Sequence, residues 1–316
     1  MDHNFENLFH EIESENDSIH LYHLRYNLND DGESRPVTDQ LVNVLFNNIA
    51  EFGFGPAYYE KILQDSKPLE LIVQAAKKLY EIEGVQEVSN LVDLNKLNEL
   101  DEQKERNPYL TRGEFGELLT YMFLTNIFNA PQLFSKIYFK DSNGVPAHGF
   151  DAVHVNLETE QLWVGESKLY TNDLQAIDAL SKDVMEHFNT KFFETEFGII
   201  QNRLADTYVR NHFTPEKLEY FQELTNPTTL NFSDLLNSMN LVLFAAFDIN
   251  APFDDDDDLH EIILERSSTL VERLAKNISE NSWSQLIQYH VVLLPVESKN
   301  ELILELHRRL SLFQMM

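Results

Sequence analysis

Two neighbouring apolar segments carry charged residues whose types and spacing could support hydrolysis of a phosphodiester bond. The first segment contains Asp151, and the second ends with Glu166, Ser167 and Lys168. Because side chains alternate along a strand, Glu166 and Lys168 point to one face and Ser167 to the other. If residues 156–161 form a hairpin turn, Asp151 lies on the adjacent strand and reaches the face that carries Glu166 and Lys168.

These three charged side chains could assemble a metal-dependent hydrolytic site. Carboxylate oxygens of Asp151 and Glu166 suit a hard divalent cation such as Mg²⁺ or Mn²⁺, which would polarise a phosphoryl oxygen and lower the pKa of a bound water. Lys168 would orient that water or stabilise charge in the transition state. The alternative is a structural ion pair at a strand end, but the apolar strand before Glu166 and the hairpin-spaced Asp151 favour the functional interpretation.

An acidic residue on the preceding helix is a third candidate for this site. Thr111 and Glu114 fit a capping box, in which each side chain bonds a free amide at the start of a helix, so Glu114 has a structural explanation. Glu117 lies one turn further along, beside the apolar residues Phe115 and Leu118. A carboxylate at the edge of a core-facing stripe needs another reason to be there, so we favour Glu117 as an outer ligand or organiser of the site.

Hydrophobic periodicity predicts the elements that would position these side chains. Residues 35–110 have a helical pattern, and residues 19–26 could form a strand before them. The helices expected after residue 110 cover residues 112–127, 172–188, 261–276 and 298–310. The strands expected there cover residues 133–140, 149–156, 162–168, 241–249 and 290–296.

The polar stretch at residues 101–108 is the expected boundary between two domains. Residues 1–108 form a mostly helical N-terminal domain in this interpretation, and residues 109–316 form the domain that carries the acidic residues and Lys168. The order of elements in the second domain predicts helices packed on a central mixed sheet, so the expected fold class is α/β.

The chain is strongly acidic, with 53 Asp and Glu residues, 24 Lys and Arg residues and a net charge of −29. Basic side chains that neutralise phosphates supply much of the affinity of DNA-binding proteins, so most of this surface should repel nucleic acid. Either the chain does not bind nucleic acid, or it binds nucleic acid through a local basic groove, or a second protein provides the binding surface. Lys182, His187 and Lys191, on and just after the helix that follows Lys168, are candidates for a local basic rim.

Several other classes of protein are excluded by the sequence. The absence of cysteine excludes disulfides and thiolate metal sites. The acidic N-terminus lacks a signal-peptide pattern, and the longest apolar run, residues 241–247, is too short to span a bilayer; both features fit a cytoplasmic protein. No glycine-rich phosphate loop or serine-nucleophile elbow is present, so ATP hydrolysis by this chain is not expected.

The chain resembles the PD-(D/E)XK nuclease superfamily, whose members carry a Glu on a helix, an Asp on the second core strand and Glu-x-Lys on the third. The corresponding residues here are Glu117 (or Glu114), Asp151, Glu166 and Lys168. Phe150 stands where the pattern has proline, which many members lack. The resemblance implies an α-β-β-β-α-β core, a Mg²⁺ or Mn²⁺ ion held by Asp151 and Glu166, and hydrolysis of DNA.

A closer resemblance is to the HamA family, the nuclease subunits of Hachiman antiphage defence systems. It rests on residues 112–119, 148–154 and 165–170. The resemblance implies a DNA endonuclease that a superfamily-2 helicase partner, HamB, holds in check and supplies with DNA, which would account for the acidic surface. The alternative is a catalytically silent subunit that keeps the nuclease fold and regulates a helicase through that surface.

Overall fold

A computed structural model describes residues 5–14, 16–28, 34–79, 113–133, 150–205, 210, 213–226, 228–229, 231–249, 256–284 and 286–316. The strands are β1 (Phe9–Ile12), β2 (Ile19–Leu24), β3 (Tyr26–Leu28), β4 (Ser34–Pro36), β5 (Ala152–Asn156), β6 (Gln161–Leu169), β7 (Met239–Asp248) and β8 (Gln288–Val296). The helices are η1 (Phe5–Leu8), α1 (Thr38–Asn47), α2 (Ile49–Phe54), α3 (Pro56–Leu63), α4 (Pro68–Leu79), α7 (Glu114–Asn126), α9 (Asp173–His187), α10 (Thr190–Leu204), α12 (Pro215–Leu224), α13 (Phe232–Ser238), α14 (Asp256–Ile278) and α15 (Lys299–Met315).

Six of the strands form one mixed sheet in the order β1-β2-β8-β7-β6-β5. The four central strands β2, β8, β7 and β6 are parallel, whereas β1 and β5 pair antiparallel at the two edges. The central strands β7 and β8 are buried along nearly their whole length, as parallel strands covered on both faces must be. The mixed α/β class expected from the sequence is therefore confirmed.

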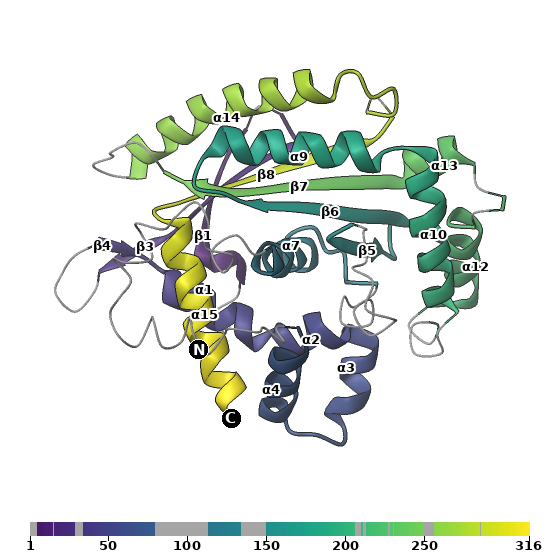
Figure 1. The fold of residues 1–316 in the computed structure, drawn as a ribbon, viewed down its shortest axis with the longest axis horizontal. Coiled ribbons are helices and arrows are strands. Elements are labelled where there is room, and N and C mark those ends of the chain that lie inside the picture. The colour runs from purple at the N-terminus through teal and green to yellow at the C-terminus, as the bar shows by residue number, and fades with distance from the viewer. Residues whose placement is uncertain are drawn as a thin grey trace.

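Helices cover both faces of this sheet, with α9 and α14 on one face and α7, α1 and α15 on the other (Figure 1). Side chains of β6 alternate between the two cores: Val164 packs on the side of α9, and Trp163 packs on the side of α7. A side chain's position in β6 therefore decides which helix it meets. None of the helices in the described residues combines the length and apolar character needed to cross a membrane.

The elements expected around the acidic residues are confirmed where the structure describes them. Strands β5, β6, β7 and β8 and helices α7, α9, α14 and α15 coincide with the predicted segments to within a few residues. The strand predicted at residues 133–140 lies outside the described residues except for Leu133, whose amide bonds the Val153 carbonyl. A complete PD-(D/E)XK core therefore stays a prediction.

The N-terminal part contributes strands as well as helices to the fold. β2 pairs parallel with β8, with Ile19 opposite Val291, so residues near the N-terminus belong to the same sheet as the C-terminal strands. Helices α1 and α2 pack in one hydrophobic core with α7 and α15. The predicted boundary at residues 101–108 lies outside the described residues, and the division into domains at residue 108 stays a prediction.

Candidate active site

A tight hairpin brings Asp151 beside the strand that carries Glu166 and Lys168. The Asn156 side-chain oxygen accepts bonds from the amides of Glu158 and Thr159, which stabilises the turn at residues 157–160. In the hairpin register Ala152 is opposite Gly165. Asp151 comes just before the first residue of β5, at the level of Glu166, so the hairpin predicted from the sequence is confirmed.

Asp151 forms hydrogen bonds with the part of β6 that extends beyond the first residue of β5. Its Oδ2 accepts a bond of 2.9 Å from the Ser167 amide and one of 2.8 Å from the Ser167 hydroxyl. A carboxylate oxygen thus replaces the carbonyl that a longer β5 would have presented to this amide. These two bonds fix the Asp151 side chain next to the strand segment that carries Glu166 and Lys168.

Glu166 is buried within the sheet layer, with only 2% of its surface exposed. Its Oε1 lies 2.8 Å from Nδ1 of His187, the last residue of α9. Burial raises the pKa of Glu166 to about 7; the bond from His187 opposes this rise, and the charges of Asp151 and Asp183 add to it. A carboxyl group whose pKa lies near neutrality and that has charged neighbours is typical of a functional site.

Lys168 forms an ion pair with Asp183 of α9. Burial alone would lower the pKa of Lys168, but the bond and charge of Asp183, together with the charges of Asp151 and Glu166, raise it above its ordinary value. The ammonium group is therefore charged at neutral pH. It can stabilise negative charge close to the two strand-borne carboxylates.

Helix α9 presents Asp183 and His187 to β6 from one face, because residues four positions apart lie above one another on a helix. The helix begins after the Asn172 cap, whose side-chain oxygen accepts a bond from the Gln175 amide at 2.9 Å. Phe192 stacks on the His187 ring at 4.4 Å between centroids and orients it. Stacking and the bond to Glu166 turn His187 inward, so the predicted basic rim does not include it.

Sequence reasoning missed Asp183 and assigned His187 only to the surface. The i, i+4 spacing of the two residues, on the helix directly after the Glu-x-Lys strand, is the signal that could have identified them. Lys182, another member of the predicted rim, is exposed and pairs with Glu186.

Helix α7, which carries Glu117, packs at very short range on the face of β6 opposite to the one that carries Glu166 and Lys168. A Cβ on Gly116 would lie 2.8 Å from Ser167 Oγ, and a Cβ on Gly165 would lie 2.8 Å from Thr120 Cγ2. Glu117 follows Gly116 directly and is half-buried. Its role as the third acidic residue stays a prediction.

The capping box predicted for α7 involves Thr111, which lies outside the described residues. The described helix begins at Glu114 with Gly113 as its N-cap, and no side chain bonds this cap. The side chain of Glu114 also lies outside the described part of the chain, so the preference for Glu117 over Glu114 stays a prediction.

His154, three residues after Asp151, has a structural role. It is fully buried on the α7 side of β5, where its Nδ1 bonds the Ala130 carbonyl at 2.6 Å, and burial lowers its pKa to about 4. His148 lies outside the described residues.

The donor atoms present fit a hard divalent cation. Asp151 and Glu166 offer carboxylate oxygens, and a cation between them would relieve the repulsion that contributes to the raised pKa of Glu166. In the described residues no third His or acidic group joins these two with all ligand atoms within 4.8 Å. The chain would then supply two ligands and leave the others to water and phosphate, which is a common arrangement for Mg²⁺.

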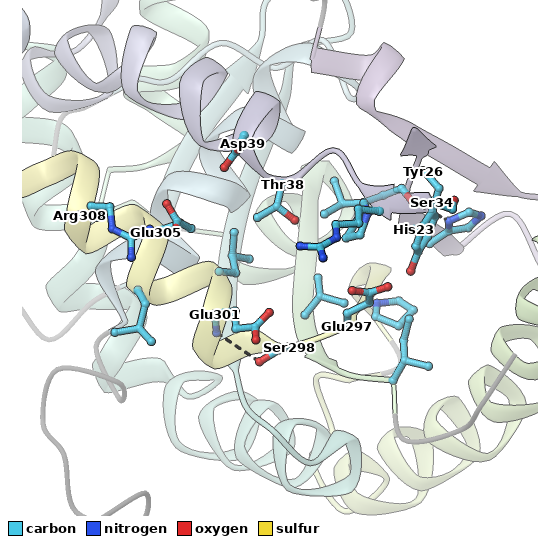
Figure 2. Close-up of a pocket in the computed structure, with 18 residues that line it drawn as sticks. His23, Tyr26, Ser34, Thr38, Asp39, Glu297, Ser298, Glu301, Glu305 and Arg308 are labelled. Carbon is cyan, nitrogen blue, oxygen red and sulfur yellow. Dashed lines mark hydrogen bonds and ion pairs between the residues drawn. The ribbon is translucent and has the colours of Figure 1, made fainter. Parts of the chain in front are cut away.

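Two cavities of the described structure lie away from the acidic residues. One of about 590 Å³ lies between α15, the start of α1 and the ends of β2 and β8, where Thr38, Glu301 and Arg308 line it (Figure 2). Another of about 700 Å³ lies beyond the end of β6, beside α14. Neither Glu166 nor Lys168 lines either of these two cavities.

Fold and site together define a mixed α/β protein in which a buried glutamate, a partly buried aspartate and a lysine lie on one strand hairpin of the central sheet. The chain belongs to the HamA family, whose model matches residues 2–310. This confirms the family resemblance and makes the chain a protein associated with Hachiman antiphage defence. None of the curated proteins and none of the solved structures matches it.

Proposed function

We propose that the chain is a Mg²⁺-dependent DNA endonuclease and the effector of a Hachiman defence complex. The observation that carries the proposal is Glu166, a buried carboxyl group with a pKa of about 7, beside Asp151 and two residues before Lys168. Membership of the HamA family supports the defence role. In the proposed site, the carboxylates of Asp151 and Glu166 and the ammonium group of Lys168 lie within one short part of the β5–β6 hairpin.

Each residue of the site has a role that its contacts support. Asp151 and Glu166 would hold the cation, which supplies Lewis-acid chemistry and an activated water when bound. Lys168 would orient the attacking water or stabilise the charge that develops on the phosphoryl oxygens. Asp183 and His187 are positioning residues, because they act through Lys168 and Glu166. Glu117 would contribute an outer ligand from α7.

A partner protein is part of the proposal because the chain has a net charge of −29. Such a surface opposes the approach of a polyanion. A superfamily-2 helicase that binds DNA and presents it to the sheet edge would overcome this repulsion and would also restrain the nuclease until DNA is sensed. The acidic surface of the free chain then keeps it inactive.

Loss of cleavage in two substitutions tests the site. Glu166→Ala and Lys168→Ala should abolish cleavage of plasmid DNA by the chain assembled with its helicase, ATP and Mg²⁺, because a metal ligand and the charge-stabilising group are lost. Matched controls are Glu186→Ala and Lys182→Ala, which remove an exposed pair on α9 and should leave cleavage unchanged. Full activity in both site variants would remove this site from consideration.

The rival function is a catalytically silent subunit that regulates a helicase through its acidic surface. One observation favours it: both Glu166 and Lys168 are already paired with residues of α9. The two functions separate in the same assay, run with Mg²⁺, Ca²⁺ or EDTA. Cleavage that requires Mg²⁺ supports the nuclease, whereas inactivity under every condition, with helicase activity that changes when the chain is added, supports the rival.

A further inference from the structure

Three histidines from distant parts of the chain meet beside the outer edge of the central sheet. His10 on β1 and His23 on β2 are directly opposite each other, and His260 lies near the start of α14. One ligand nitrogen of each ring lies within 4.8 Å of the others. We propose that these histidines bind a divalent transition-metal ion of the zinc type, at a site separate from the proposed nuclease centre.

The protonation of His23 favours metal binding. Its ring is 1% exposed, and its Nδ1 lies 2.9 Å from the Leu24 carbonyl oxygen. A carbonyl only accepts, so Nδ1 carries a proton, and in the neutral ring Nε2 is then the nitrogen that can bind a metal. A backbone carbonyl that fixes the tautomer in this way is a common second partner of metal-binding histidines.

The Nε2 atom of His23 is directed at a second histidine. His23 Nε2 lies 2.8 Å from Nε2 of His260, and the His10 and His23 rings stack at 5.3 Å between centroids. In the absence of metal, only one proton can lie between the two Nε2 atoms. A metal ion in place of that proton would join both nitrogens by stronger bonds.

Arg25 indicates that His10 is also deprotonated at Nε2. The Arg25 Nη1 atom lies 3.1 Å from this nitrogen, and a guanidinium group only donates, so His10 Nε2 accepts. This ring nitrogen therefore has a lone pair for which Arg25 and a metal ion compete. Removal of the arginine side chain should strengthen metal binding.

The donor set selects the kind of ion. Three imidazole nitrogens suit Zn²⁺ and its neighbours in the transition series, whereas Mg²⁺ prefers oxygen. Tetrahedral Zn–N bonds place ligand nitrogens about 3.3 Å apart, which lies between the 2.8 Å of His23 and His260 and the 4.8 Å limit of the trio. Water or a carboxylate would complete the coordination, and the acidic chain raises the local cation concentration.

A metal at this point would fasten the β1–β2 hairpin to α14. Within the described part of the chain, β1 is an edge strand that pairs only with β2, and His23 also lines the cavity next to α15 (Figure 2). Metal binding should therefore stabilise the whole fold, since the ligands come from both ends of the chain.

The test uses Co²⁺ as a spectroscopic probe, Zn²⁺ as competitor and the full chain with Glu166→Gln, which removes the other carboxylate site. We expect one Co²⁺ per chain, a visible absorption spectrum of tetrahedral Co²⁺ that Zn²⁺ abolishes, and a melting temperature that rises by several degrees with Zn²⁺. His260→Gln and His23→Gln should lose all three signals, and Arg25→Gln should bind several-fold more tightly.

The matched control is His20→Gln on the same strand, because His20 pairs with His290 and Phe128 away from the trio. It should keep the metal signals. His260 is a partly exposed helix residue, so its glutamine variant should fold even if the buried His23 variant does not; circular dichroism checks this. Failure of the histidine-intact protein to bind Co²⁺ or Zn²⁺, or binding that survives in His260→Gln, would overturn the proposal.

Discussion

Glu166 is buried, and ionisation of its carboxyl group therefore costs free energy. Burial raises its pKa to about 7, against 4.5 in an exposed chain. His187, whose own pKa is raised by Glu166 after burial has lowered it, offsets part of this cost. An apolar or amide side chain would be more stable at this position, and the metal-binding role that we propose for Glu166 would account for a carboxyl group there.

The cost of ionising Glu166 predicts how stability depends on pH. Between pH 4.5 and 7 the folded chain holds the Glu166 proton more tightly than the unfolded chain, so stability falls as pH rises through this window. The His187 contribution, from a raised pKa, is also lost as pH rises. A shift from 4.5 to about 7 corresponds to roughly 3 kcal/mol.

Glu166→Gln should therefore gain roughly 3 kcal/mol of stability relative to the wild type between pH 4.5 and pH 8. Urea unfolding followed by circular dichroism, repeated across this range, measures the difference. Glu186→Gln is the control, because Glu186 is exposed on the same helix. Parallel stability curves for the wild type and Glu166→Gln would contradict the raised pKa.

At the scale of elements, the contact between α7 and β6 depends on two glycines. Gly116 of the helix and Gly165 of the strand have neighbouring side-chain atoms where a Cβ would be placed. Ser167, which anchors Asp151, lies in the same contact. The two glycines let the backbones of α7 and β6 approach closely, and this packing therefore also affects the positions of Ser167 and Asp151.

Gly165→Ala should destabilise the chain by about 1–3 kcal/mol, because its Cβ would lie 2.8 Å from Thr120 Cγ2. Thermal or urea unfolding measures the loss. Thr120→Ser removes that methyl group, so the double variant should recover part of the stability. Gly198→Ala, which has nothing within 4 Å of its Cβ, is the control and should stabilise α10 by up to ~1 kcal/mol. A loss that Thr120→Ser does not reduce would place the strain elsewhere.

The sequence predicts local elements better than their long-range partners. The apolar runs of β6 and β7 are local signals, and both strands are confirmed. The pairing of Ile19 in β2 with Val291 in β8 joins residues far apart in the chain, and no local pattern encodes it. Helix α7 begins at Glu114, two residues after the predicted start, which is within the range by which helix ends vary.

The candidate site shows the same limit. Strand alternation and hairpin spacing were enough to bring together Asp151, Glu166 and Lys168, because these relations are local. The contacts of Asp183 and His187 depend on the rotation of α9 about its own axis. That rotation is set by packing of the helix on β6 and β7, which a sequence pattern does not specify.

At the scale of the whole molecule, charge dominates the behaviour towards DNA. The net charge of −29 is spread over a chain whose arginines include several in ion pairs, such as Arg266 with Asp173 and Arg273 with Asp178. Paired cations contribute little to a basic surface. The family's defence role and the acidic surface are compatible if DNA arrives on another protein.

The isolated chain should therefore bind duplex DNA only weakly. Non-specific complexes of ordinary DNA-binding proteins have dissociation constants of about 10⁻⁴ to 10⁻⁶ M in physiological salt, and this chain should be weaker than that range. Fluorescence anisotropy with labelled duplex and Ca²⁺ in place of Mg²⁺, to prevent cleavage, measures the affinity. Addition of the helicase should produce a ternary complex in which the chain is retained. Submicromolar binding by the chain alone would show that a basic groove outweighs the net charge, and the partner would then not be needed to deliver DNA.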